Sequence, residues 1–291
     1  MSTAQLAASS AEVASLSGAI YRDGIAPMPG AFAREWAEQL RADFDAAFTH
    51  ARSYERGTIS RGPNRHYFAV HPQAVSGFAE LASHPTLVAL CTEMLGHDYK
   101  IVELGFDVPL PGAVDQPWHR DFPADAAEQA EGVLTSLAFN VTTVDVTPDM
   151  GPFEIAPGTH WDSGDGMAHE MFPEGGAIAH YDALGSRRHP KQGDMSVRTG
   201  LAIHRGTANV SDRVRAVLIL GVARHDLDTE VHDLHVTRDY FDALPESVRE
   251  HLECTVVDEL RPIVQKHDIE GLMMGGPADV FPAPRRAAEG S

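Results

Sequence analysis

Among the short segments that place a histidine two residues before an aspartate are His119-Arg120-Asp121 and His160-Trp161-Asp162. On an extended backbone, residues i and i+2 point to the same face, so the imidazole and the carboxylate of such a pair can bind one ion. With a second histidine, the two imidazoles and one carboxylate leave open positions on a non-heme iron(II) for a co-substrate and O₂. With 16 histidines in the chain, about one such pair arises by chance. The spacing alone therefore leaves both pairs open.

Four helices are expected in the first third of the chain, at 9–20, 31–51, 74–82 and 85–95. The first begins at a capping box, in which Ser9 is followed by Glu12. The second carries an apolar stripe with one residue in every four, typical of a helix packed on a sheet: Phe32, Trp36, Leu40, Phe44 and Phe48. Gly96 fits the position that ends the last helix.

From residue 99 onward, short apolar segments alternate with Gly, Pro, Asn and Asp. We predict strands at 99–108, 133–142, 153–156, 194–197, 200–204 and 214–223. Many short strands with polar turns are typical of an all-β sandwich or barrel. The segments 56–71 and 162–192 lack periodicity; the first is predicted to be a loop or irregular strands, and the second a functional lid or mobile connection.

No internal repeat or linker divides the chain, so we expect one domain over residues 1–291. Its helical N-terminal part would cover about 9–96, its β core about 99–225, and a C-terminal helical segment about 237–270. The helical pattern in this last segment is clearest at 237–252.

Charge and composition restrict the partners and the compartment. The net charge of −19 argues against a nucleic acid or an anionic membrane surface, because both repel an acidic protein. No stretch approaches the roughly 18 apolar residues of a membrane span, and residues 1–17 do not resemble a signal peptide. Two cysteines, Cys91 and Cys254, are typical of a reducing cytosol, although one bridge between them stays open. We expect a cytoplasmic protein with a small-molecule substrate; no pattern indicates an oligomeric state.

Three blocks of the sequence resemble the phytanoyl-CoA dioxygenase family of Fe(II)/2-oxoglutarate oxygenases: Trp118–Asp121, Val146–His160 and Gly193–Arg215. The likeness runs from about residue 18 to residue 250. It implies a mainly β fold with flanking helices and a double-stranded β-helix, or cupin-like jelly-roll, core. It also implies Fe(II), 2-oxoglutarate and O₂ as cofactors and co-substrates. The expected reaction is hydroxylation or another oxidation of a C–H bond in a small organic molecule, such as a secondary metabolite, with release of succinate and CO₂.

The resemblance also chooses between the two His-x-Asp pairs. It implies that His119, Asp121 and His204 are the metal ligands and catalytic centre, whereas His160 belongs to a Pro-Gly-Thr-His turn that is structural or lines the cavity. The aspartate argues against the halogenase variant of this chemistry, in which a small residue replaces the carboxylate.

Arg215, eleven residues after His204, corresponds to the arginine that holds the far carboxylate of 2-oxoglutarate in this family. It opens an apolar strand, where a buried guanidinium is costly unless it meets an anion. Its planar fork can bind a carboxylate through two hydrogen bonds, although an internal salt bridge is the alternative. Arg213 lies on the same face of the strand, and only the family spacing favours Arg215.

Further contacts to 2-oxoglutarate are expected from four side chains. Asn140 and Thr142 face the same way on the predicted strand 133–142. The resemblance adds Gln116 and a helping cation, Arg65 or Arg61. For each of them, an ordinary polar role is an equally good interpretation.

Arg120 departs from the family pattern, because many members have Gln between the metal ligands. Alternation points it away from the metal, where it would form a salt bridge with Asp115 or Asp125 or reach an acidic group of the substrate. Two rival functions remain: a cupin-like metalloenzyme that uses the same ligands without 2-oxoglutarate, and a metal-free binding module. A buried Arg215 opposite the metal argues against the first, and the intact ligand set argues against the second.

Overall fold

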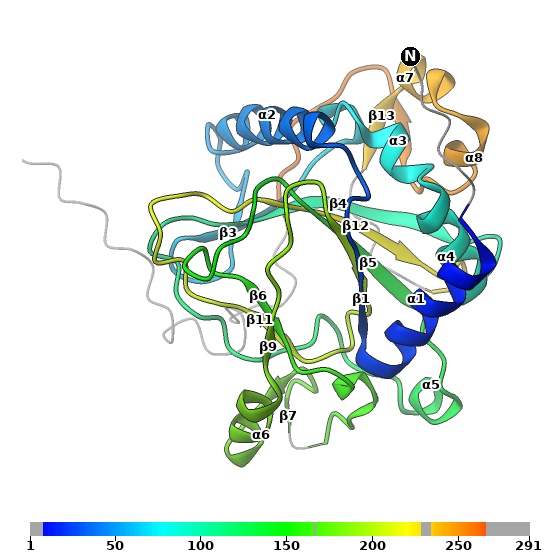
Figure 1. The fold of residues 1–291 in the computed structure, drawn as a ribbon. Helices are drawn as coiled ribbons and strands as arrows, with labels where there is room; N and C mark the ends of the chain where they lie inside the picture. Colours follow the sequence, from blue (N-terminus) through cyan, green and yellow to red (C-terminus); the bar gives the residue numbers. More distant parts are fainter. Residues whose placement is uncertain (1–7, 166, 228–233, 266–291) are drawn as a thin grey trace, which may run out of the picture.

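The structure is a computed structural model that describes residues 8–165, 167–227 and 234–265, and the statements below refer to these ranges. Two antiparallel sheets face each other as a jelly roll (Figure 1). The larger sheet contains, in spatial order, β1 (Ile25–Met28), β10 (Met195–Arg198), β5 (Ser136–Thr142), β12 (Val217–Ala223), β4 (Lys100–Pro109), β3 (Arg65–Ala69) and β2 (Ile59–Ser60). The smaller sheet contains β11 (His204–Gly206), β6 (Phe153–Ile155) and β9 (Ser186–Arg187). This confirms the expected fold class.

The larger sheet has two different faces, because side chains alternate along each strand. In β5, Leu137, Phe139 and Val141 are buried in the main hydrophobic core, whereas the residues between them line a cavity. Leu218 and Leu220 of β12 enter the same core, and their neighbours on that strand also face the cavity. One face of the sheet therefore holds the fold together while the other forms the inner wall of the site.

Helices cover the core face of the larger sheet (Figure 1). They are α1 (Ser10–Asp23), α2 (Arg34–Ala51), α3 (Phe78–Ala82) and α4 (Pro85–Leu95), with a 3-10 turn η1 (Pro72–Ala74) before α3. The hydroxyl of Ser9 accepts a hydrogen bond from the backbone N–H of Glu12, which confirms the predicted cap. In α2, Leu40 and Phe44 of the predicted stripe are buried against the sheet.

The segment 56–71, predicted to be a loop or irregular strands, contains the edge strands β2 and β3, so the second alternative is the one observed. The strand predicted at 200–204 is wrong in its bounds: β11 begins at His204, because residues 199–203 carry the chain from the larger sheet to the smaller one. A short helix that was not predicted, α5 (Ala126–Glu131), is capped by the carboxylate of Asp125.

The segment 162–192 has structure of its own: β7 (Met167–Ala168), β8 (Phe172–Pro173), α6 (Gly176–Leu184) and β9, after the 3-10 turn η2 (Thr159–Trp161). The helix predicted at 237–252 is interrupted. It consists of α7 (Arg238–Ala243) and α8 (Glu246–Arg249), because Pro245 cannot continue a helix. β13 (His235–Thr237) and β14 (Thr255–Val257) form a small parallel sheet, so the predicted C-terminal segment is helical only at 238–243 and 246–249. Residues 266–270 lie outside the described ranges.

Both cysteines of the chain are free thiols, Cys91 buried and Cys254 half-buried. Among the described residues, no helix combines the length and the apolar character that crossing a membrane requires.

Candidate metal centre and adjoining cavity

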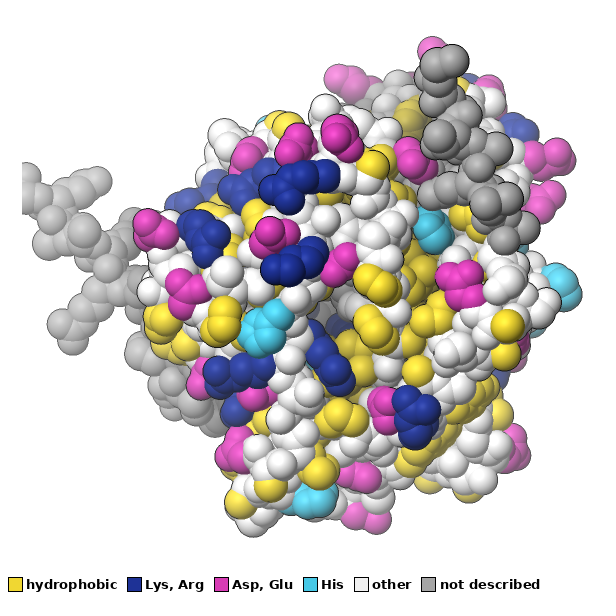
Figure 2. Space-filling view, in the orientation of Figure 1, with side chains coloured by type: hydrophobic (Ala, Val, Ile, Leu, Met, Phe, Trp, Pro, Cys, Tyr) yellow, Lys and Arg dark blue, Asp and Glu magenta, His cyan; other side chains and the backbone are white. Residues whose placement is uncertain are grey.

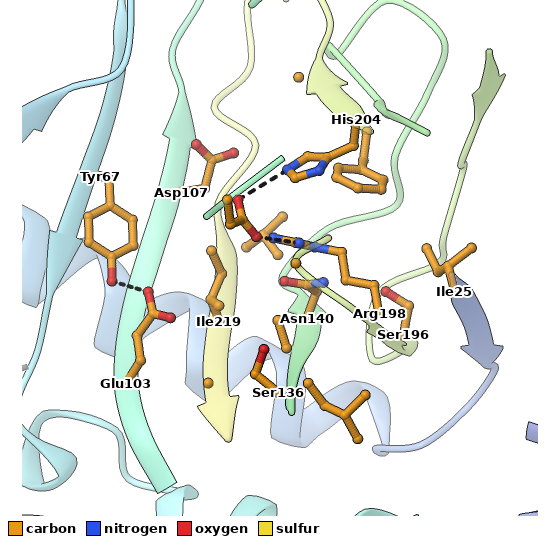
Figure 3. A pocket seen from close by; sticks show the side chains of 18 of the residues that line it. Ile25, Tyr67, Glu103, Asp107, Ser136, Asn140, Ser196, Arg198, His204 and Ile219 are labelled. Carbon is orange, nitrogen blue, oxygen red and sulfur yellow. Dashed lines mark hydrogen bonds and ion pairs between the residues drawn. The ribbon is translucent and has the colours of Figure 1, made fainter. Parts of the chain in front are cut away.

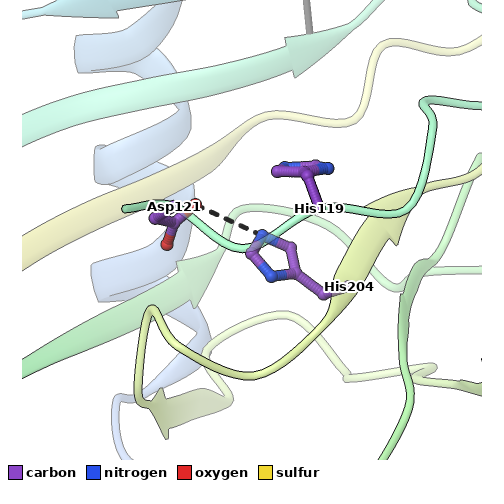
Figure 4. Close-up of side chains that lie close together, drawn as sticks. All are labelled: His119, Asp121 and His204. Carbon is purple, nitrogen blue, oxygen red and sulfur yellow. Dashed lines mark ion pairs between the residues drawn. The ribbon is translucent and has the colours of Figure 1, made fainter. Parts of the chain in front are cut away.

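Two backbone hydrogen bonds bring the metal-ligand candidates together. His119 and His204 exchange both N–H to C=O bonds, at 2.9 and 2.8 Å, so the segment that contains His119 pairs with the edge of the smaller sheet. Asp121 follows two residues later, and its N–H donates to the carbonyl of Gly200 at 2.8 Å. One ligand atom from each of the three side chains lies within 4.8 Å of the others (Figure 4). In the described part of the chain this is the one such group found, and it excludes the His160-Trp161-Asp162 pair.

The two imidazoles are oriented for metal binding. Nδ1 of His119 hydrogen-bonds the carbonyl of Pro117 at 2.9 Å, and Nδ1 of His204 hydrogen-bonds the carbonyl of Ala202 at 2.8 Å. These bonds fix the ring orientation and leave both Nε2 atoms for the ion. Burial and the neighbouring His204 lower the pKa of His119 to about 3, so this ring is neutral, as a ligand must be.

Asp121 has a second partner that the sequence did not reveal. One carboxylate oxygen lies 3.4 Å from Nε2 of His204, and the other lies 2.5 Å from Nη1 of Arg198. Although burial acts to raise it, Arg198 and His204 bring the pKa of Asp121 well below its ordinary value. Arg198 therefore holds one oxygen and turns the other toward the imidazoles. No local pattern marks Arg198, because it reaches Asp121 only when β10 takes its place in the larger sheet.

A cavity of about 1270 Å³ extends from these ligands along the inner wall of the larger sheet. Figure 3 shows His204, Asp107, Asn140 and Arg198 around it. Figure 2 shows a hollow in the same face of the molecule, bordered by hydrophobic side chains and by Lys or Arg side chains. The volume exceeds that of most single-ligand pockets, which is roughly 300–1,000 Å³. The cavity therefore has room for two small molecules beside the metal ligands.

Arg215 lines this cavity and is buried. Its Nη2 lies 3.4 Å from Oδ2 of Asp107, and Nη1 of Arg65 lies 3.1 Å from the same oxygen. The internal salt bridge that the sequence left as an alternative is thus present, but it is shared. Two buried guanidinium groups face one carboxylate, and the Nε of each has no hydrogen-bond partner among the described residues. Burial lowers the pKa of Arg215 to about 10. The carboxylate of Asp107 acts to raise this pKa, whereas the neighbouring Arg65 lowers it further.

The other candidates for 2-oxoglutarate contact occupy different positions. Asn140 and Thr142 both line the cavity; the Asn140 amide has no hydrogen bond within the described residues, and the Thr142 hydroxyl donates to a backbone carbonyl. Gln116 lines the cavity too, but its amide already bonds the backbone of Arg61 and Gly206. Arg65 is not among the residues that line the cavity; its guanidinium pairs with Asp107 and donates to the carbonyl of Thr207.

Two further expectations are decided by geometry. Arg213 lies at the surface and donates to the hydroxyl of Thr147, so it does not compete with Arg215. The salt bridge expected from Arg120 to Asp115 or Asp125 is wrong. The buried Arg120 guanidinium donates to the carbonyl of Asp162 at 2.9 Å.

The two acids expected to pair with Arg120 bind backbone N–H groups elsewhere. Asp115 accepts from the N–H of Ala208, and Asp125 caps α5. His160 is fully buried, with Nε2 bonded to the carbonyl of Tyr21. Its role is structural, because it anchors the end of α1.

The fold and the donor set define a jelly-roll protein with a two-histidine, one-carboxylate metal centre that lines a large cavity. A family model described as phytanoyl-CoA dioxygenase (PhyH) matches residues 20–217. The chain belongs to this family.

Several solved structures share the fold. The non-heme alpha-ketoglutarate-dependent epimerase SnoN from nogalamycin biosynthesis is 21% identical, with a TM-score of 0.55 over 74% of this chain and 82% of that chain. HygX from Streptomyces hygroscopicus, solved with nickel and 2-oxoglutarate, is 16% identical, with a TM-score of 0.57 over 84% of this chain and 95% of that chain. Curated protein sequences gave no significant match. At these identities the structural likeness establishes the fold alone.

Proposed function

We propose that this protein is an Fe(II)/2-oxoglutarate-dependent oxygenase that hydroxylates, or otherwise oxidises, a C–H bond of a small organic molecule. One observation carries the proposal. The cavity that contains the His119, Asp121 and His204 ligand atoms also contains Arg215, whose buried positive charge is only partly balanced. Family membership supports the same reaction class, as do the SnoN complex with Fe3+ and alpha-ketoglutarate and the HygX complex with nickel and 2-oxoglutarate.

The residues present fit iron(II). Two imidazole nitrogens and one carboxylate oxygen, on one side of the ion, are the donor set of non-heme iron oxygenases. Both Nε2 atoms are free to bind because both Nδ1 atoms bond backbone carbonyls. When bound, iron(II) would supply the O₂ chemistry that converts 2-oxoglutarate to succinate and CO₂ while a C–H bond is oxidised.

The chain's own residues would position the reactants. Arg215 would bind the far carboxylate of 2-oxoglutarate through its planar fork. Asp107 holds that guanidinium in place, and Asn140 and Thr142 offer polar atoms on the neighbouring strand. Ile219, paired in register with Asn140, adds an apolar side chain to the same wall.

Three features support the finer assignments. A cavity of about 1270 Å³ suits a small-molecule substrate. SnoN, and the carbocyclase SnoK of similar fold, come from nogalamycin biosynthesis, which supports a secondary metabolite as the substrate here. The two free thiols support a reducing compartment such as the cytosol.

An anaerobic titration tests the proposal. Purified protein receives Fe(II) and then 2-oxoglutarate, while the visible charge-transfer band between iron and a chelated keto acid is followed. The expected result is a band in the wild type, no band in His119→Ala, and a much higher 2-oxoglutarate requirement in Arg215→Met. Arg213→Met is the matched control, because it removes a surface arginine from the same segment.

Absence of the band in wild-type protein with iron demonstrably bound would refute the 2-oxoglutarate assignment. It would instead favour a cupin-like metalloenzyme that uses the same ligands without a keto-acid co-substrate. A positive result justifies a substrate screen by succinate release.

A further inference from the structure

The inner wall of the larger sheet has a polar end that the metal centre and the co-substrate do not use. Strand register orders this wall into rows. Asp107, Val217 and Thr142 are paired across β4, β12 and β5 at the end that contains Arg215. Glu103, Gly221 and Ala138 form a second row farther along the same three strands.

The two rows are far enough apart to hold different molecules. Glu103 precedes Asp107 by four residues on β4, which at about 3.3 Å per residue is a separation of about 13 Å. Figure 3 shows Glu103 and Ser136 on the side of the cavity away from His204. A co-substrate carboxylate held at Arg215 therefore leaves the Glu103 row to another ligand.

Glu103 is held in place by a specific arrangement of the chain. One carboxylate oxygen accepts a short hydrogen bond from the hydroxyl of Tyr67 on β3. Two glycines make room for this pair. A Cβ at Gly105 would lie 2.5 Å from the Tyr67 hydroxyl, and a Cβ at Gly221 would lie 2.7 Å from Cβ and from Oε2 of Glu103. Any larger residue at either position would displace the pair.

The second oxygen of Glu103 has no partner in the described part of the chain, and Glu103 forms no ion pair there. Of the arginines that line the cavity, Arg198 pairs with Asp121, Arg215 pairs with Asp107, and Arg61 lies over the Tyr67 ring at 5.4 Å from its centroid. A carboxylate that faces a cavity with an unused oxygen, and with no ion-pair partner among the described residues, is suited to a ligand that supplies both a positive charge and N–H donors.

Two polar side chains near Glu103, on β5, have no hydrogen bond within the described residues. Ser136 pairs in register with Ala223 and lines the cavity, and its hydroxyl forms no hydrogen bond within the described residues. Asn140 lies between this end and the co-substrate end, with an unused amide. Between Glu103 and Ser136 the wall is formed by two small residues, Gly221 and Ala138, whose side chains occupy little of the cavity.

From this arrangement we propose that Glu103 is a specificity-determining residue that binds a protonated amine of the substrate, with Ser136 as a flanking hydrogen-bond partner. The substrate class is thus a small molecule that carries an ammonium group and some hydroxyl or amide groups. This rests on the proposed function for the identity of the second ligand, but the amine site itself needs neither iron nor turnover.

The test compares two probes of the same carbon skeleton, cyclohexylmethylamine with a terminal ammonium and cyclohexylmethanol with a neutral hydroxyl, by ligand-observed NMR titration of the full-length protein near pH 7. Wild type is expected to bind the amine at least tenfold more tightly than the alcohol. Glu103→Gln, which keeps the shape and removes the charge, is expected to abolish this preference. Asp23→Asn is the matched control, because Asp23 also lines the cavity but already pairs with Arg22.

Equal binding of the two probes by wild type, no binding of the amine, or a preference that survives in Glu103→Gln would each overturn the proposal. Circular dichroism and the iron/2-oxoglutarate charge-transfer band check that Glu103→Gln is folded. Absence of that band in the wild type would refute the proposed function. The amine preference is measured without iron, so the probe titration tests it independently.

Discussion

Replacement of Arg215 by methionine should have opposite effects on the stability of the metal-free protein and on co-substrate binding. Methionine keeps much of the apolar volume of the side chain but removes its charge. Asp107 would remain paired with Arg65, at 3.1 Å, so no buried carboxylate is left alone. The substitution therefore removes an incompletely balanced buried cation without creating a new unpaired group.

The pKa of Arg215 gives the size of the first effect. Burial lowers it from its ordinary value to about 10, against the pull of Asp107 and with the help of Arg65. At about 1.4 kcal/mol for each pH unit, the charged form is less stable in the folded protein by an upper limit of about 3 kcal/mol. Because the folded pKa lies below the unfolded one, this cost is fully present at pH 7 and is relieved only above about pH 10. We expect Arg215→Met to stabilise the metal-free protein by about 1–3 kcal/mol.

The same substitution should weaken the binding of 2-oxoglutarate. Charge-assisted hydrogen bonds to the far carboxylate of 2-oxoglutarate contribute about 1.5–3 kcal/mol, so their loss should weaken binding by about 10- to 100-fold. Urea unfolding of the metal-free protein and calorimetric titration of 2-oxoglutarate into the metal-loaded protein measure the two effects. Arg213→Met should change neither, because Arg213 is at the surface. A destabilised Arg215→Met protein with unchanged 2-oxoglutarate affinity would show that Arg215 is a structural ion-pair partner only.

Three other substitutions test separate parts of the structure. Arg198→Met should weaken Fe(II) binding by about 10- to 100-fold, because the ligand Asp121 loses the partner that orients it; a metal titration in which Arg198→Met equals wild type would contradict this. Gly206→Ala should destabilise the fold by about 1–3 kcal/mol, because a Cβ there would lie 2.3 Å from Nη1 of Arg65. Urea unfolding would show this, with the unobstructed Gly18→Ala as control. Burial lowers the pKa of His160, so the unfolded chain takes up a proton first and stability should fall as the pH drops below about 6.5. Unfolding of His160→Gln at several pH values should show a shallower fall, and an identical pH dependence would exclude this histidine as a source.

Short-range patterns predicted the elements well where a local rule governs them. The Ser9 cap depends on the backbone N–H of Glu12, three residues away, and it is present as predicted. In β5, the burial of Leu137 and Phe139 follows from strict alternation along the strand. The predicted 237–252 helix is interrupted at Pro245, because a proline cannot continue a helix.

The metal centre depends on a local sequence pattern and also on contacts between distant parts of the chain. The extended segment that presents His119 and Asp121 to the same side is a local property, whereas His204 joins them only because two backbone hydrogen bonds align it with His119. Its assignment from sequence came from the family resemblance, because spacing alone did not distinguish the two His-x-Asp pairs.

By itself, the sequence determined the helices with clear periodicity, the alternating strands and the resemblance that implied the ligand set. Only the tertiary structure decided that Arg65 and Arg215 share Asp107 and that Arg198 takes one oxygen of Asp121. The physical reason is that an ion pair depends on distances of a few ångströms between residues far apart in the chain. Those distances are set by the order and register of the strands, which no local pattern of residue types specifies.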